Sequence, residues 1–370
     1  MFLKDTWYVA AWPNEIEPGK PFARTICSEP IVFFRTAGGG VAALEDRCCH
    51  RHYPLSKGKV CDGVIRCGYH GFEYAGDGRC VKVPSQSIIP DGTRVRSYPC
   101  VQKHNLVWIW MGDPARADPA AIVDFSWLDS PQWRWKGTMY PVKANYELVV
   151  ENLLDLTHIA FLHESTIGNY ALVNAEMRTT RTDDEVTVSR WMVDSDPPPT
   201  YQKAGNFAGK VDRWQIIRYS KPALVRLSVG AMDHGAGAKD FMGDGFQPHP
   251  PRTNGIGMFN FNMITPQTER TTHYFWAQGH DFRLEDPKVT ELVFSQVEIA
   301  FHEDWAVFEL IQDRMDSHPG RDPKAAYVAP ADLPRVDVNG DSGGIQAIRI
   351  LHRAIAAEEQ RLQGVGTRAA

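Results

Sequence analysis

Two short stretches in the first hundred residues are the most informative part of this sequence: RCCHRH at 47–52 and CGYHG at 67–71. In the first stretch a cysteine and a histidine are separated by one residue, in the second by two, and sixteen residues lie between the pairs. Two cysteines and two histidines on two loops can hold metal with a mixed sulfur and nitrogen ligand set. Zinc modules more often use CxxC or HxxxH on a helix, and neither pattern occurs here.

The combination of CxH with CxxH is the ligand pattern of a Rieske cluster, in which cysteines hold one iron of a [2Fe-2S] unit and histidines hold the other. The segments 48–58 (CCHRHYPLSKG) and 67–74 (CGYHGFEY) are similar to the Rieske motif. Cys49 departs from it, since the family usually has proline there, and we interpret Cys49 as a thiol that binds no metal. Structural zinc is the alternative. The predicted cluster ligands are Cys48, His50, Cys67 and His70.

Composition excludes several classes of function. The formal charge of -5 and the pI near 6.2 give no basic field for nucleic acid. The N-terminus fits neither a signal peptide nor a membrane anchor, and no later stretch reaches eighteen apolar residues. We therefore expect a cytoplasmic protein with no membrane association. All seven cysteines lie within the first 100 residues and are expected to be thiols or ligands rather than disulfides.

The chain divides into two regions of different texture. From about 24 to 110, short apolar runs alternate with glycine-rich turns, which predicts a small all-β domain. The polar stretch GDPARADPAA (112–121) is typical of a connector, so domains of 1–120 and 121–370 are expected. The second region begins with an apparent helix at 144–163, continues with strands between 176 and 280, and adds a long helix at 286–315. This order favours an α+β domain with an antiparallel sheet, and a final amphipathic helix at 344–362 is expected at a surface or subunit contact.

A second group of polar residues lies in ENLLDLTHIAFLH (151–163). His158 and His163 are five positions apart, so on an ideal helix their side chains would point about 140° apart. They can face one metal only if the helix widens or ends between them, and we predict a π-bulge or a helix end there. Asp155 lies one helical turn before His158, where it can hydrogen-bond that imidazole. Ordinary helix histidines are the alternative.

The long helix at 286–315 offers a carboxylate for the same metal. Its apolar stripe recurs at spacings of three and four residues, and Asp304 falls within that stripe. A carboxylate buried there without a partner would be costly, so Asp304 needs a cation. Glu303 and Glu298 lie off the stripe and are expected to be solvated.

These motifs resemble those of the Rieske non-haem iron oxygenases. Similarity to that family extends over nearly the whole chain, from WYVAAWP (7–13) to the final helix, and is strongest to the vanillate O-demethylase oxygenase group. The resemblance implies a helix-grip catalytic domain and a mononuclear Fe(II) held by His158, His163 and Asp304. It also implies a homotrimer, in which the cluster histidine of one chain passes its electron through Asp155 of the next. Asn152 and Asp155 are the predicted catalytic residues beside the ligands.

The resemblance further implies the reaction. Such enzymes use O2 and two supplied electrons to hydroxylate a methoxy carbon of a methoxybenzoate such as vanillate, which then releases formaldehyde. No GxGxxG nucleotide loop occurs, so NAD(P)H is expected to act only through a separate flavin and [2Fe-2S] reductase. Gln215 and Asn262 are candidate groups for orienting the aromatic substrate, with core or surface roles equally open. The alternatives are ring dihydroxylation, methyl hydroxylation of a sulfonate, N-demethylation, or a Rieske electron carrier.

Overall fold

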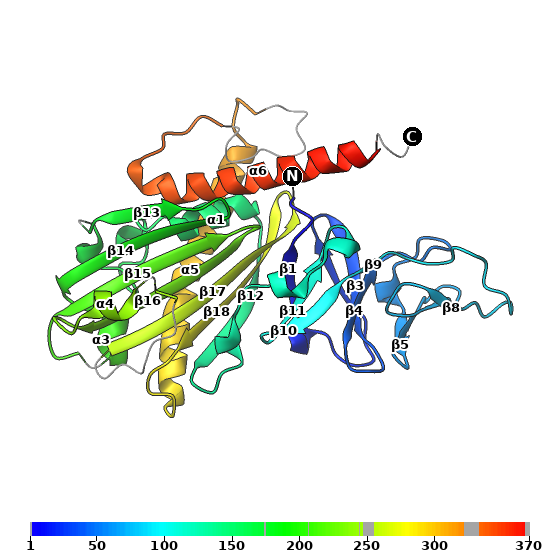
Figure 1. Ribbon diagram of the computed structural model, residues 1–370, viewed down its shortest axis with the longest axis horizontal. Helices are drawn as coiled ribbons and strands as arrows, with labels where there is room; N and C mark the ends of the chain where they lie inside the picture. Colours follow the sequence, from blue (N-terminus) through cyan, green and yellow to red (C-terminus); the bar gives the residue numbers. More distant parts are fainter. Residues whose placement is uncertain are drawn as a thin grey trace. The chain divides into compact units, whose positions relative to one another are not determined.

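The computed structural model describes residues 2–173, 175–205, 207–243, 245–246, 255–321 and 333–366. The chain forms two compact units (Figure 1), one of Met1–Asp129 with Thr265–Thr268 and one of Ser130–Ile264 with Glu269–Ala370. The division therefore falls after Asp129 rather than after residue 120. Residues beyond 120 pack on the smaller unit, because Phe125 stacks on Trp108 with ring centroids 6.3 Å apart and Asn105 donates to the Leu128 carbonyl.

The smaller unit is all-β, as its alternating apolar runs and glycine turns predict. It contains three antiparallel sheets, and the strand of the WYVAA segment, which was not predicted, is completely buried. The sheets are β1 (Trp7–Ala11), β11 (Leu106–Trp110) and β10 (Cys100–Lys103); β2 (Phe22–Ile26), β3 (Glu29–Arg35), β4 (Val41–Glu45) and β9 (Ser97–Tyr98); and β5 (Lys59–Cys61), β6 (Val64–Arg66), β7 (Glu73–Tyr74) and β8 (Cys80–Lys82). Single 3-10 turns connect them at Pro13–Glu15, Leu55–Lys57, Pro114–Arg116, Pro119–Ala121 and Ser126–Leu128.

The two loops that carry the cysteine and histidine pairs lie next to the third sheet of the smaller unit. The first loop follows β4, and the second joins β6 to β7. Both loops enter one hydrophobic cluster, since Cys48 and Cys67 are buried together with Phe34, Ile65 and Tyr74. The cysteines are thus anchored in the core of this unit.

The larger unit is built on a seven-stranded antiparallel sheet, which confirms the α+β prediction. Its strand order is β12-β18-β17-β16-β15-β14-β13. The bounds are β12 (Arg134–Val142), β13 (Met177–Arg181), β14 (Glu185–Ser195), β15 (Val211–Ser220), β16 (Leu224–Asp233), β17 (Gly255–Thr268) and β18 (Thr271–His280). The strand β12 had not been predicted from the sequence.

Six helices accompany this sheet in the part of the chain that is described: α1 (Tyr146–Leu154), α2 (Ile159–Leu162), α3 (Pro199–Gly205), α4 (Ala238–Met242), α5 (Pro287–Asp316) and α6 (Ser342–Gly366). The helix α5 matches the predicted long helix and crosses one face of the sheet, which we call the inner face (Figure 1). Phe301 of α5 contacts Tyr274 and Trp276 of β18 there, with ring centroids 5.7 and 4.9 Å apart. The final helix α6 packs against α1, β13 and β14.

The helix predicted at 144–163 is not continuous. α1 ends at Leu154, Asp155 has an extended backbone with φ -88° and ψ 115°, and α2 covers only four residues. His158 lies at the N-cap of α2 and His163 at its C-cap. The predicted helix end between the two histidines is confirmed, and the additional break before His158 was missed because apolar periodicity does not reveal a local change of backbone angle. Among the described helices, none is both long and apolar enough to cross a lipid bilayer.

Candidate metal centres

The first candidate metal centre joins the two loops of the smaller unit. Cys48 and Cys67 are each 2% exposed, whereas His50 and His70 are exposed. The two imidazole rings lie with their centroids 4.5 Å apart. Burial raises the pKa of the Cys67 thiol, and the hydrogen bond and charge of Cys48 raise it further. The sulfurs therefore lie together inside the protein and the imidazoles lie together at its surface.

A tyrosine hydroxyl borders the sulfur side of this centre. The Tyr74 hydroxyl lies 3.1 Å from the Cys48 sulfur and 3.2 Å from the Cys49 sulfur. Burial raises the pKa of Tyr74, and its contacts with the two cysteines raise it further, so the hydroxyl keeps its proton. The sequence analysis missed this residue, although its place three residues after the CGYHG segment was visible.

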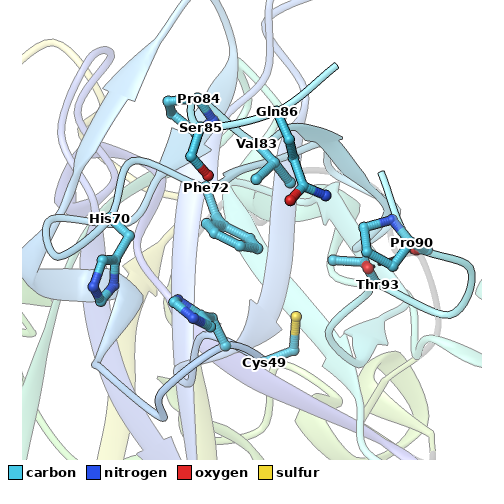
Figure 2. Close-up of a pocket in the computed structure, with 10 residues that line it drawn as sticks. Cys49, His70, Phe72, Val83, Pro84, Ser85, Gln86, Pro90 and Thr93 are labelled. Carbon is cyan, nitrogen blue, oxygen red and sulfur yellow. Dashed lines mark hydrogen bonds between the residues drawn. The ribbon is translucent and has the colours of Figure 1, made fainter. Parts of the chain in front are cut away.

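Cys49 and His70 line an open pocket of about 640 Å³ at the imidazole end of the centre. Figure 2 shows Phe72 between His70 and Cys49, with the Cys49 sulfur turned toward the interior of the pocket. The His50 ring stacks on Phe72 at a centroid distance of 4.9 Å. The histidine edges are thus accessible from outside this unit.

The second candidate centre lies in the larger unit, where α2 meets α5. Oδ1 of Asp304 lies 3.6 Å from Nε2 of His158 and 3.2 Å from Nε2 of His163. One possible ligand atom from each of the three residues lies within 4.8 Å of the others. Asp304 is 3% exposed and His163 is 1% exposed, so the site is nearly dry. The α5 stripe had predicted this burial of Asp304.

Each imidazole of this second centre is held from behind by a carboxylate. Nδ1 of His158 lies 3.4 Å from Oδ2 of Asp155, and Nδ1 of His163 lies 2.7 Å from Oε2 of Glu303. Burial lowers the pKa of His163, but the hydrogen bonds and charges of Asp304 and Glu303 outweigh it and raise that pKa overall. The expectation that Glu303 is solvated was wrong, because its carboxylate is half-buried and hydrogen-bonded to the imidazole of His163.

Asn152 and Asp155 also lie at this centre. Asn152 Nδ2 donates to Asp304 Oδ1 over 3.1 Å, while its buried Oδ1 finds no hydrogen-bond partner among the residues that the structure describes. Asp155 Oδ1 accepts from both the backbone N–H and the hydroxyl of Thr157. Burial raises the pKa of Asp155, but the hydrogen bonds from His158 and Thr157 outweigh burial and lower it. Asp155 is therefore an anion at the border of the site.

The donor sets fit the groups that the sequence implies. Two buried thiols opposite two accessible imidazoles suit a [2Fe-2S] cluster with one sulfur-bound and one nitrogen-bound iron. Two imidazoles whose Nε2 atoms face one buried carboxylate suit a facial triad for Fe(II) that leaves positions open. The carboxylates on the Nδ1 atoms fix the tautomer that ligation through Nε2 requires.

The two predicted substrate residues lie on the inner face of the sheet. Asn262 donates to the Val225 carbonyl and accepts from the Tyr274 hydroxyl, whereas Gln215 Oε1 accepts from Arg190. Asn262 shares its face with Asn260, as the strand alternation predicted, because its amide also donates to the Asn260 side chain. Both amides are thus already engaged within the protein.

The sequence analysis missed two buried arginines on the same face. Arg190 and Arg213 are 2% and 1% exposed. The strands that carry these arginines were predicted correctly. Because side chains alternate between the two faces of a strand, the pattern also placed both arginines on the face opposite the solvent-facing positions. Nothing in the local pattern reveals whether such an arginine has a carboxylate partner.

Comparison with known proteins agrees with both centres. Residues 6–99 match the Rieske [2Fe-2S] domain, and residues 142–357 match the vanillate O-demethylase oxygenase C-terminal domain. The chain is 39% identical to the toluene-4-sulfonate monooxygenase system iron-sulfur subunit of Comamonas testosteroni, with 97% of this chain and 98% of that protein covered. It is 35% identical to the vanillate O-demethylase oxygenase subunit of a Pseudomonas species, with 97% of each covered.

The fold agrees with solved structures as well. Dicamba monooxygenase bound to dicamba superimposes with a TM-score of 0.84 at 30% identity, covering 97% of this chain and 99% of that one. A Rieske domain is thus followed by a helix and sheet catalytic domain in both proteins. The chain belongs to the Rieske non-haem iron oxygenases and is an oxygenase component whose catalytic domain is that of the vanillate O-demethylase group.

Proposed function

We propose that this oxygenase component hydroxylates the methoxy carbon of a methoxybenzoate such as vanillate, so that the product separates into a phenol and formaldehyde. The observation that carries the proposal is the group of His158, His163 and Asp304 within a domain that matches the vanillate O-demethylase oxygenase. Relatives named as vanillate and dicamba O-demethylases, at 35% and 34% identity, support the same class of reaction.

Two groups of residues would bind the two metal centres. Cys48, Cys67, His50 and His70 hold the [2Fe-2S] cluster, and His158, His163 and Asp304 hold the iron. When bound, the cluster supplies electrons and the iron supplies the capacity to activate O2.

The residues around the iron ligands orient them. Asp155 and Glu303 keep Nδ1 of each imidazole hydrogen-bonded, so that Nε2 stays directed at the metal position. Asn152 donates to the oxygen of Asp304 that faces both imidazoles. The low exposure of His163 and Asp304 excludes bulk water from this side of the reacting centre.

Assembly and electron supply complete the proposal. We place Asp155 on the electron path between the cluster histidine of one chain and the iron of a neighbouring chain in a homotrimer. A separate NAD(P)H-dependent flavin and [2Fe-2S] reductase delivers the electrons. Gln215 and Asn262 border the aromatic ring of the substrate on the inner face.

A second candidate reaction is hydroxylation of the methyl group of an aromatic sulfonate. It is favoured by the identities of 39% and 40% to two proteins of the toluene-4-sulfonate monooxygenase type. Both reactions hydroxylate a CH3 group close to an aromatic ring. In a methoxybenzoate an oxygen joins this group to the ring, and in the sulfonate it is bonded to the ring directly, so one site geometry serves either.

The test is a substrate panel with the purified protein, a Rieske oxygenase reductase and NADH. With vanillate and other methoxybenzoates, the enzyme should consume O2 and release one formaldehyde for each O2 consumed. 4-Methylbenzenesulfonate should instead give a hydroxymethyl product without formaldehyde if the second reaction is the true one. Ring diols from either set would contradict both proposals, and the Asp304→Ala variant provides the inactive control.

A further inference from the structure

Two buried arginines face the interior of the catalytic unit without an acidic partner. Arg190 of β14 pairs in register with Gln215 of β15, two positions from Arg213, and all three side chains lie on the inner face. Within the described residues neither arginine forms an ion pair with a carboxylate, whereas Arg24, the third described arginine that is at most 9% exposed, pairs with Glu15. A buried guanidinium without a counter-ion is costly, and such groups are seldom retained without a function.

Arg190 donates to neutral acceptors within the described part of the chain. Its Nε and Nη2 donate to Gln215 Oε1 over 3.1 and 2.7 Å, and its remaining bonds go to the carbonyls of Leu156 and Leu172. Burial and the positive charge of Arg213 lower the pKa of Arg190, the charge of Asp155 raises it, and the net result is a pKa of about 10. Arg190 therefore contributes positive charge to the interior, and four of its five N–H groups already donate to protein acceptors.

Arg213 has donors left over. Its Nη2 donates to the Ile167 carbonyl over 2.9 Å, and its side chain is also within hydrogen-bonding reach of the Tyr201 hydroxyl. Among the described residues, its buried Nε and Nη1 have no hydrogen-bond partner. The guanidinium carbon lies 4.7 Å from the centroid of the Tyr201 ring, which supports one of its faces. The Arg213 guanidinium is 1% exposed and has N–H groups without an acceptor, which indicates a site that an anion would complete.

Both arginines attach to the segment that carries the two iron-site histidines. Arg190 holds the carbonyl of Leu156, two residues before His158. Arg213 holds the carbonyl of Ile167, in a turn that is closed by two hydrogen bonds onto the His163 carbonyl, from Thr166 and Gly168. A ligand on Arg213 would therefore lie beside the loop that leads directly from the iron site.

We propose that the free donors of Arg213 bind the acidic group of the substrate, a carboxylate or a sulfonate, and that Arg190 adds charge without contact. The inference rests on the proposed function for the aromatic acid substrate, and it names the side chain that recognises the acidic group. It also gives Gln215, whose Oε1 accepts from Arg190, a role in positioning that guanidinium. The acid is held at one end of the ring while the carbon to be hydroxylated points toward His158, His163 and Asp304.

Anaerobic calorimetry tests this site without turnover. The probes are 4-methoxybenzoate, 4-methylbenzenesulfonate and the uncharged 4-methoxybenzamide. The intact protein should bind one or both acids better than the amide, and Arg213→Gln should raise the Kd for the acid roughly 10- to 100-fold while leaving the Kd for the amide nearly unchanged. Arg213→Lys keeps the charge but loses the planar donor set, so its Kd for the acid should lie between the values of the intact protein and of Arg213→Gln.

The control is Arg218→Gln, because Arg218 lies on the same strand but on the opposite face, where it donates to Thr187. Iron content and the visible spectrum of the cluster establish that each variant is folded. Equal acid binding by the intact protein and Arg213→Gln would overturn the inference, as would a preference for the amide. Acid binding that depends on Arg213 without any formaldehyde or hydroxymethyl product would support the anion site and refute the proposed reaction.

Discussion

At the scale of single residues, the iron site is defined by what holds each ligand. Asp155 and Glu303 lie behind the two imidazoles, and Asn152 lies beside the carboxylate of Asp304. Each ligand is therefore oriented before a metal arrives, which lowers the cost of assembling the site.

Replacing Asp304 with alanine should remove the mononuclear iron alone. The buried carboxylate is the anionic ligand, so iron per chain should fall from about three to about two, and the visible spectrum of the cluster should persist. Metal analysis with absorption spectroscopy measures both. Asp313→Ala, a solvent-facing change on the same helix, should retain all the iron. Full iron retention in Asp304→Ala would refute the ligand assignment.

Replacing Glu303 with glutamine should weaken iron binding without abolishing it. The amide cannot supply the charged acceptor that fixes Nδ1 of His163, and loss of such a partner typically costs about 10- to 100-fold in metal affinity. Competition with a calibrated chelator gives the change. Glu298→Gln is the matched variant, and equal affinities for the two variants would argue against a positioning role.

Replacing Tyr74 with phenylalanine should lower the reduction potential of the cluster. A cluster-bound Cys48 thiolate would carry no proton, so the Tyr74 hydroxyl 3.1 Å away would donate to it and stabilise the more negative, reduced cluster. A hydrogen bond worth about 0.5–1.5 kcal/mol corresponds to roughly 20–60 mV for one electron. Protein-film voltammetry measures the shift, and Tyr98→Phe, whose hydroxyl donates to Glu29, should leave the potential unchanged.

Sequence pattern predicted some of these residues and not others, for a physical reason. Asp304 could be found because helical periodicity defines which positions are buried, and a buried carboxylate needs a cation. The role of Glu303 could not be predicted, because it depends on contact with His163, which lies 140 positions earlier in the chain. Arg213 likewise required the whole sheet, since only the register of neighbouring strands shows that no acid faces it.

At the scale of elements, the short helix α2 sets the geometry of the iron site. The five-residue spacing of its histidines was enough to predict that the helix could not continue, because an unbroken helix would direct them apart. The length of the break was not predictable, since it depends on the extended backbone of Asp155 and on the turn after His163.

Gly168→Ala should disrupt that turn. A Cβ at Gly168 would lie 2.3 Å from the Ile159 carbonyl oxygen and 3.0 Å from that of His163, so backbone atoms would have to move. We expect a stability loss of roughly 1–3 kcal/mol and reduced iron occupancy. Gly209→Ala, where a Cβ meets nothing within 4 Å, is the control in thermal unfolding and iron analysis. A normal iron content with unchanged stability would show that the turn tolerates a side chain.

At the scale of the whole molecule, the two metal centres belong to different compact units of the chain. The pattern of strands and helices predicted both units, but the boundary was displaced because the turns after residue 120 pack on the smaller unit. No sequence pattern gives the number of chains in the assembly, because this depends on complementary surfaces rather than on local periodicity.

Mixing inactive chains tests the proposed trimer. A Cys67→Ser chain lacks the cluster and an Asp304→Ala chain lacks the mononuclear iron, so each assembly alone should be inactive. Co-expressed chains should recover part of the activity, because the cluster of one chain reduces the iron of its neighbour. Adding Asp155→Asn to the Cys67→Ser chain should reduce the recovered rate about 10- to 100-fold with all iron retained. A monomeric mass by light scattering, or no recovery in mixed assemblies, would contradict electron transfer between chains.

The hydroxyl of Tyr74 has one hydrogen and two sulfurs within reach, those of Cys48 and Cys49. A substitution at position 49 is therefore expected to change the hydrogen bonding of the cluster sulfur although Cys49 is not a predicted ligand. Proline at this position brings no second sulfur, so the hydrogen goes to Cys48 alone, whereas cysteine competes for it. A residue that binds no metal would thus alter the driving force for electron delivery while the ligand set stays intact.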